Sequence, residues 1–276
     1  MAVQRRLWVL LPLCYFLPAA AVAAAPTHAQ ITTWCNNADP ELRIRGCSAL
    51  IQSGKEPARV LVGAFFNRGN AYEAKGQYDL AIQDFDSALK RNPNDAAAFF
   101  SRGSSYFAKG QTDSAIQDFD SAIKFDPNDA TTFNNRGEAY REKGQEDRAI
   151  QDFDKAVTLK PNYADAFNNR GAVYMSKRQA ERAIQDFDSA IKLNPNFADA
   201  FSNRGGAYLV KGQADLAIKD FDSAIKLNPR HAIALYYRSV AKRNTGDADG
   251  IAKDLAAAKA IDPDIAGKAA QQGFAP

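Results

Sequence analysis

Hydrophobic residues in the C-terminal half of the chain recur at the spacing of an α-helix. Phe201, Gly205 and Tyr208 lie at positions i, i+4 and i+7, so they share one face of a predicted helix. Gly212 follows this helix, at the position where a residue in the left-handed conformation commonly ends a helix. A second helix is predicted after Gly212 and ends before Pro229. The second helix has an apolar face with the same spacing, made of Ala217, Phe221 and Ala224. The segment therefore predicts two short helices joined by a turn.

This helix pair returns along the chain at intervals of thirty-four residues. The aromatic residue that opens each copy is Phe65, Phe99, Phe133, Phe167 or Phe201. The proline that closes each copy is Pro93, Pro127, Pro161, Pro195 or Pro229. A weaker copy runs over 235–263. One helix pair cannot bury both of its apolar faces alone, so the period predicts that neighbouring pairs stack into one elongated body.

Two positions in each copy indicate how its helices meet. A glycine in the middle of the first helix costs roughly 1 kcal/mol relative to alanine, which predicts a compensating close approach. These glycines are Gly69, Gly103, Gly137, Gly171 and Gly205. The matching large residues of the second helix are Phe85, Phe119, Phe153, Phe187 and Phe221. We expect each phenylalanine to contribute about 1.5–3 kcal/mol when buried against its glycine.

The tripeptides NRG and DFD recur in most copies, in the first and second helix respectively. Residues two apart on a helix do not face each other, so the paired aspartates are not an acid/base pair. Their repetition predicts a structural bridge between the two helices. Arg136 with Asp152 or Asp154 is one example.

The pattern of aromatic, small residue and Tyr, then Ala, Phe, Ala and Pro, resembles the tetratricopeptide repeat family. The resemblance implies an all-α, right-handed α-solenoid. Five full repeats are expected at 62–95, 96–129, 130–163, 164–197 and 198–231, with a degenerate repeat at 232–265. In the degenerate repeat Ser239, Lys242, Ile251 and Leu255 replace the Gly, Tyr, Ala and Phe of the pattern. Residues 266–276 are expected to form a C-terminal tail with at most a loose helix.

The N-terminus has the pattern of a secretory signal. Arg5 and Arg6 precede an apolar run over 7–25, and small residues follow. A cut after Ala29 suits a signal peptidase better than one after Ala25, because Pro26 would follow the latter. The predicted signal peptide is therefore 1–29, and the protein is expected to be exported, to the periplasm or outside the cell. The alternative is an uncleaved segment that anchors the protein in a membrane.

Cysteine usage agrees with export, because Cys35 and Cys47 are the two that remain without the leader. A disulfide between them would contribute on the order of 3 kcal/mol. Two free thiols, or half of a metal site, are the alternatives. The segment 41–54 resembles an isolated second helix and is expected to cap the first repeat, which makes 30–61 an N-terminal cap.

Composition excludes several function classes. The formal net charge is +3, and Lys and Arg alternate with Asp and Glu, so a phosphate-binding stripe is not expected. No catalytic Ser–His–Asp set, phosphate-binding glycine loop or metal-ligand cluster is present in the sequence. We therefore predict a non-enzymatic protein without cofactor, metal, nucleic acid or small-molecule substrate.

Binding is expected on the concave face, which the family forms from its first helices. In the fourth repeat the positions left free are Asp165, Asn168, Asn169, Ala172, Met175 and Ser176. One such position recurs as Asn67, Asn135, Asn169 and Asn203, with Ser101 in the second repeat. Asparagine is a poor helix former, so the row needs a reason. The resemblance implies that the amides hold the backbone of an extended peptide. The alternative is that each bonds a neighbouring helix and fixes the stack.

The concave positions change character along the array. Phe66, Phe100 and Phe107 lie there in the first two repeats. In the third, fourth and fifth repeats the position of Phe66 and Phe100 is taken by Asn134, Asn168 and Ser202. This predicts an aromatic patch that binds a side chain of a partner, unless the N-terminal cap covers it. The protein is thus predicted to be a monomeric or weakly oligomeric scaffold for an extended peptide segment. The alternative function is a structural module that associates with itself or with envelope proteins through its ends or convex face.

Overall fold

The computed structural model describes residues 26–244 and 246–271, and these residues form helices without any strand. The cap consists of α1 (His28–Cys35) and α2 (Pro40–Ser53). Five helix pairs follow: α3 (Ala58–Ala74) and α4 (Tyr78–Leu89), α5 (Ala96–Ala108) and α6 (Thr112–Phe125), α7 (Ala130–Glu142) and α8 (Glu146–Leu159), α9 (Ala164–Ser176) and α10 (Ala180–Leu193), α11 (Ala198–Val210) and α12 (Ala214–Leu227). The last described elements are α13 (Ala232–Ala241), the 3₁₀ turn η1 (Lys242–Asn244), α14 (Ala248–Ile261) and α15 (Ile265–Gln271).

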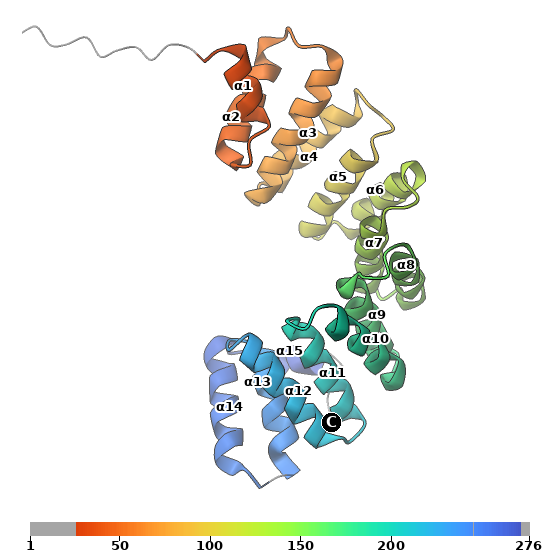
Figure 1. Ribbon diagram of the computed structural model, residues 1–276, viewed down its shortest axis with the longest axis vertical. Helices are drawn as coiled ribbons and strands as arrows, with labels where there is room; N and C mark the ends of the chain where they lie inside the picture. The colour runs from red at the N-terminus through yellow and green to blue at the C-terminus, as the bar shows by residue number, and fades with distance from the viewer. Residues whose placement is uncertain (1–25, 245, 272–276) are drawn as a thin grey trace, which may run out of the picture.

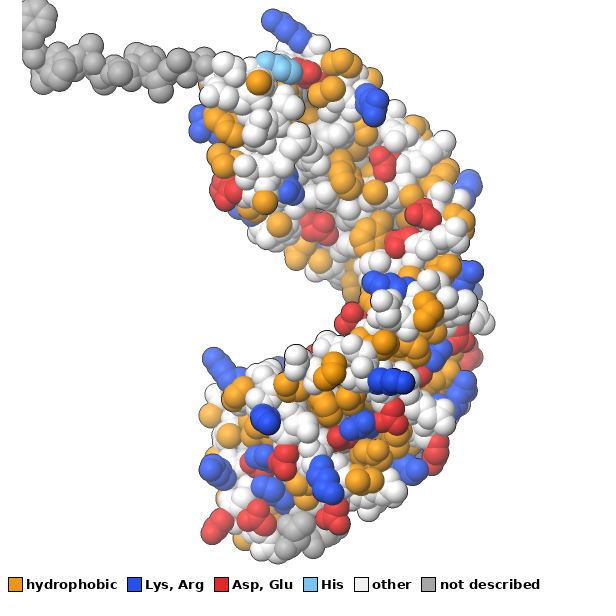
Figure 2. Space-filling model, viewed as in Figure 1, with side chains coloured by type: hydrophobic (Ala, Val, Ile, Leu, Met, Phe, Trp, Pro, Cys, Tyr) orange, Lys and Arg blue, Asp and Glu red, His pale blue; other side chains and the backbone are white. Residues whose placement is uncertain are grey.

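The helix pairs stack in chain order into an open arc (Figure 1). In the middle of the arc α5 and α7 lie on the hollow side, and α6 and α8 lie on the outer side. The space-filling view is hollowed on the same side, between the N-terminal and C-terminal halves (Figure 2). The prediction of an all-α solenoid of stacked helix pairs is confirmed.

The core of each pair is the predicted contact between glycine and phenylalanine. The side chains of Phe85, Phe119, Phe153, Phe187 and Phe221 are all fully buried. A Cβ atom placed on Gly171 would lie 2.7 Å from Cε1 of Phe187, and in the other four pairs the distance is 2.7–2.9 Å. Any side chain at the glycine would therefore displace the ring, which explains why the mid-helix glycines are tolerated.

The turn between the two helices needs a residue in the left-handed conformation. Glycine supplies it with φ between 68° and 76° at Gly76, Gly110, Gly144, Gly212 and Gly246. In the fourth repeat Arg178 takes this place with φ of 59°. In the five full repeats the second helix then begins without a side-chain cap, whereas Asp247 caps α14 by accepting from the N–H of Gly250 at 2.9 Å. Asp215 lies within the first turn of α12, where it meets the helix dipole, while the capping position belongs to Gln213.

Replacing Arg178 with glycine is expected to stabilise the protein by about 1 kcal/mol. A Cβ atom in the left-handed region costs about 1–2 kcal/mol, and the greater freedom of glycine in the unfolded chain offsets part of the gain. The urea midpoint measured by circular dichroism should rise. Arg178→Ala keeps the Cβ atom and should show no gain, so an equal rise in both variants would contradict the explanation.

The N-terminal cap contains the predicted disulfide between Cys35 and Cys47, whose Cα atoms lie 4.5 Å apart. Both cysteines are buried, and α2 packs on α3 as the predicted capping helix should. The segment before Cys35 is helical as well, which the sequence pattern did not predict. Gly46 allows α1 to lie against α2, because its Cβ would meet the backbone nitrogen of Cys35 at 2.4 Å.

The predicted leader lies outside the described residues except for 26–29. Thr27 caps α1, and its backbone N–H donates to the Gln30 side chain at 2.8 Å. The expected cut after Ala29 therefore falls inside α1. Among the described helices, none combines the length and hydropathy needed to cross a membrane.

The degenerate sixth repeat keeps a helix pair, and α15 packs against it. Ile265 and Ala269 of α15 are each 1% exposed, and the hydroxyl of Tyr237 donates to the carbonyl of Ala269 at 2.7 Å. The expectation of a loose final helix is therefore wrong for α15, because Ile265 and Ala269 bury their side chains against α13 and α14.

Candidate functional site

A groove of about 500 Å³ lies on the faces of α9, α11 and α13. It contains the positions of the fourth repeat that were predicted to be free for binding, apart from Asp165. It is lined by Asn168, Asn169, Ala172, Met175 and Ser176 of α9, by Asp199, Ser202 and Asn203 of α11, by His231 and Ile233 at the start of α13, and by Arg141 and Glu146. The structure thus brings two asparagines of the predicted row, Asn169 and Asn203, into one concave surface.

The asparagines along the inner helices form a chain of hydrogen bonds. Asn203 donates its amide to Oδ1 of Asn168 at 2.9 Å, and Asn169 donates to Oδ1 of Asn134 at 3.2 Å. Within one helix, Asn168 donates to Asn169 at 3.5 Å and Asn134 donates to Asn135 at 3.3 Å. We call these five residues the amide ladder. It runs without interruption from α7 through α9 to α11.

The ladder joins two sets of residues that the sequence placed in separate rows. Each bond between repeats links an asparagine to the residue thirty-five positions earlier, which is one period plus one residue. That spacing is present in the sequence and could have predicted the bonds between the two rows. These bonds hold neighbouring helices together. An asparagine amide has two N–H donors and a carbonyl with two lone pairs, so each amide can still bond a ligand. The role of the row in binding stays a prediction.

The ladder is absent from the second repeat because aromatic residues replace its acceptors. In the bonding register of the later repeats, Ser101 would face Phe66 and Asn135 would face Phe100, and neither ring carries a carbonyl oxygen. A separate bond occurs at the N-terminus, where Asn67 donates to Oδ1 of Asn36 at 3.1 Å and to the carbonyl of Cys35 at 3.3 Å. The cap thus continues the polar contacts of the repeats, and Asn36 was missed by sequence reasoning.

The predicted aromatic residues of the first two repeats are half-buried. The ring of Phe66 lies 5.9 Å from that of Phe85, and the ring of Phe100 lies 6.0 Å from that of Phe119. Phe107 contacts the same cluster as Phe100. These rings therefore cover the core of their own repeats with one face. Whether the other face binds a partner stays a prediction.

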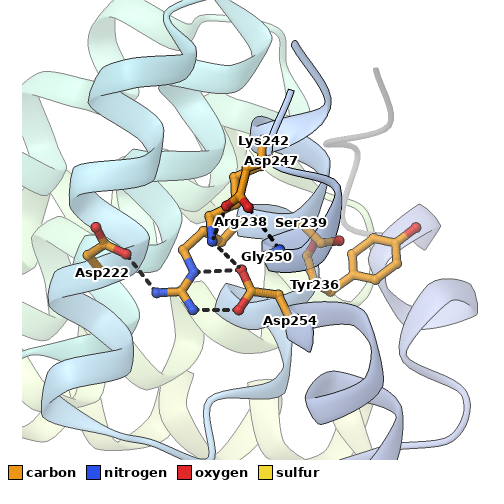
Figure 3. Close-up of polar contacts among 8 residues, drawn as sticks. All are labelled: Asp222, Tyr236, Arg238, Ser239, Lys242, Asp247, Gly250 and Asp254. Carbon is orange, nitrogen blue, oxygen red and sulfur yellow. Dashed lines mark hydrogen bonds and ion pairs between the residues drawn. The ribbon is translucent and has the colours of Figure 1, made fainter. Parts of the chain in front are cut away.

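In the first repeat the arginine of NRG, Arg68, donates to Asp84 and to Ser48 of the cap. From the second to the sixth repeat the arginine at this position connects two repeats through aspartates, also where the tripeptide is SRG or YRS. Arg238 illustrates this in the sixth repeat: two of its nitrogens donate to Asp254 at 2.8 and 2.5 Å, and the third donates to Asp222 of the preceding repeat at 2.6 Å (Figure 3). Lys242, which stands where the other repeats have tyrosine, donates to Asp254 at 3.1 Å. These hydrogen bonds raise the pKa of Arg238, so it stays charged at every physiological pH.

The predicted bridge of Arg136 is confirmed for Asp152 and wrong for Asp154. Asp152 accepts two hydrogen bonds from Arg136, at 2.8 and 2.7 Å. Asp154 faces the next repeat instead and accepts from Arg170 at 2.6 Å. Asp120 of the preceding repeat accepts the remaining bond of Arg136. Arg136 and Arg170 therefore each join the two helices of their own repeat and also bind the preceding repeat.

The described residues contain no group of three or more His, Cys, Asp or Glu side chains that could hold a metal ion. The paired aspartates are held by arginines between stacked helices. The arrangement can therefore hold helices in register and can offer amides to a ligand. The absence of catalytic activity stays a prediction.

Sequence comparison identifies the repeats. Models described as tetratricopeptide repeat or TPR repeat match 66–130, 119–151, 137–177, 164–197 and 198–231, which together cover more than half of the chain. The chain belongs to the tetratricopeptide repeat family. Tetratricopeptide repeat proteins bind other proteins or peptides and generally act as non-catalytic scaffolds. No curated protein matches the chain.

Solved tetratricopeptide structures resemble this one. The crystal structure of MamA protein is 28% identical with a TM-score of 0.55, and the match covers 62% of this chain and 93% of that chain. YrrB, described as a TPR protein with an unusual peptide-binding site, is 24% identical with a TM-score of 0.56 over 71% of this chain and 98% of its own. PilF of Pseudomonas aeruginosa is 19% identical with a TM-score of 0.68 over 78% and 100%. The last two similarities concern the fold alone.

Proposed function

We propose that this tetratricopeptide protein is a non-enzymatic scaffold that holds an extended segment of a partner protein on its inner face. The observation that carries the proposal is the amide ladder beside the groove of α9, α11 and α13. Four of the five ladder amides use one of their two N–H donors within the ladder, and Asn135 only accepts there. The ladder therefore leaves at least one donor of each amide for a peptide carbonyl. Amides that follow one another along the inner face can bind the backbone of an extended chain whatever its sequence.

The protein is further proposed to be exported and to meet its partner in an oxidising compartment. The support is the disulfide between Cys35 and Cys47, because disulfides persist where thiols are not kept reduced. The alternative function, assembly through the ends of the solenoid, has less support. The first and last repeats carry α1, α2 and α15 against them, and these elements cover the apolar faces that would stack on another copy.

The test replaces Asn67, Asn135, Asn169 and Asn203 together with alanine and captures partners from envelope extract. A partner bound by the unchanged protein should be lost, or bind at least about tenfold more weakly, because its backbone carbonyls lose their donors. Affinity is measured by titration after circular dichroism has shown that the variant is folded. The folding check matters because Asn169 and Asn203 also join neighbouring helices.

A matched control uses amides at one repeat position of the second helices. The four exposed residues Gln83, Gln117, Gln151 and Gln185 are replaced with alanine together. This control should leave the captured partner and its affinity unchanged. A partner retained by the asparagine variant and lost by the glutamine variant would move binding to the convex face and favour the assembly function.

A further inference from the structure

The amide ladder ends inside the groove with an acceptor that has no donor. In the bonding register of the ladder, Ser202 holds the place of Asn168, and Tyr237 holds the place of the asparagine that would donate to it. Tyr237 instead donates its hydroxyl to Ala269. Ser202 is 3% exposed, and its Oγ has no hydrogen-bond partner among the described residues. The groove therefore offers a buried hydroxyl oxygen at the end of a row of amides.

The part of the groove around Ser202 is lined by apolar side chains and by a carboxylate. Met175, 8% exposed, and Ile233 contribute apolar surface. Asp199 lies three residues before Ser202 on α11, and its side chain is 70% exposed. Such a site suits a long side chain that has an aliphatic stem and a polar head rich in N–H donors.

The charges that line the groove do not cancel. His231 Nδ1 accepts the N–H of Ala234, which places the ring proton on Nε2, 3.1 Å from the Asp199 carboxylate. This hydrogen bond lowers the pKa of Asp199, so the carboxylate is charged at neutral pH. Arg141 is neutralised by Glu138, to which it donates at 3.3 and 3.1 Å. Glu146 forms no ion pair within the described ranges, so the lining stays net negative while the whole chain is +3.

We propose that this groove binds the side chain of an arginine or lysine in the partner segment. The stem lies against Met175 and Ile233, the cationic head meets Asp199, and one N–H donates to Ser202 after rotation of its hydroxyl. Arginine is the preferred residue because its guanidinium has five donors in a fixed plane. The inference rests on the proposed function, since it names the chemistry of the segment that the scaffold selects.

The test uses the methyl group of Met175 as a reporter. The chain has two methionines, Met1 and Met175, so ¹³C-methyl labelling of methionine gives one signal in the groove. The probes are N-acetyl-arginine methylamide and its neutral isostere N-acetyl-citrulline methylamide. At pH 7.5 the arginine probe should shift the Met175 signal in a saturable way, at concentrations at least about tenfold lower than citrulline. Equal responses to both probes, or no response to either, would overturn the inference.

The charge contribution is isolated with two variants of equal net charge. Asp199→Asn should weaken the arginine probe about tenfold and leave citrulline unchanged. Asp215→Asn removes an exposed carboxylate from the first turn of α12 and should change neither response. An arginine response that survives in Asp199→Asn would refute the assignment. These probes have no extended backbone, so their failure leaves the test of the amide ladder intact, and loss of partner capture leaves this result intact.

Discussion

Replacing Arg170 with alanine is expected to destabilise the protein by about 3–5 kcal/mol. Arg170 donates to Asp186 at 2.8 and 2.6 Å and to Asp154 of the preceding repeat at 2.6 Å. The Asp186 side chain is only 7% exposed, so the variant leaves a buried carboxylate without its cation. The measurement is urea unfolding followed by circular dichroism, which should show a lower midpoint.

The control for this prediction is an exposed ion pair that also links two repeats. Lys177 donates to Asp147 at 2.9 Å, and the Asp147 side chain is 84% exposed. Exposed ion pairs contribute little, so Lys177→Ala should leave the midpoint unchanged within error. Equal losses in the two variants would show that burial of Asp186 is not the cause.

Replacing Phe187 with alanine is expected to cost about 3–5 kcal/mol as well. The ring is fully buried and belongs to a cluster with Ala183 and Tyr174 of its own repeat and Ala207 of the next. Its removal leaves a cavity at the joint between two repeats, so the loss should appear both in the urea midpoint and in the sharpness of the transition. Leu193→Ala, at a residue that is 39% exposed, should cost far less.

Gly171 provides a sharper check on the same contact. Gly171→Ala alone should destabilise the protein, because the new Cβ would lie 2.7 Å from Cε1 of Phe187. In the Phe187→Ala background the same change should stabilise, because it refills part of the cavity and recovers about 1 kcal/mol of helix propensity. An alanine that destabilises in both backgrounds would show that the glycine is needed for another reason.

The local structure of each repeat could be predicted from the sequence, because the residues that determine it lie within thirty-four positions of one another. The spacing of Phe167, Gly171 and Tyr174 predicts a helix face, and the glycine predicts where Phe187 must lie. The structure confirms that contact in all five full repeats. Helix periodicity, turn conformation and side-chain size act over neighbouring residues, so a single sequence carries them.

Contacts between repeats were not readable in the same way. Arg136 was assigned to its own pair, yet it also binds Asp120 of the preceding repeat, and Asp154 belongs to Arg170. The two asparagine rows were predicted separately, yet the offset between stacked helices joins them into one ladder. That offset follows from how whole helix surfaces fit together.

The candidate site shows the same division. The repeat pattern determined a chain of stacked helix pairs, and its resemblance to the tetratricopeptide family implied the solenoid with an inner row of amides. The cysteine pair favoured a disulfide in an N-terminal cap. Only the tertiary structure placed Met175, Asp199 and Ser202 around one groove. Only it showed that the hydroxyl of Tyr237 donates to Ala269 of α15. The physical reason is that periodicity specifies which face a residue occupies, whereas a binding groove depends on the distance and rotation between helices, which the packing of the assembled stack decides.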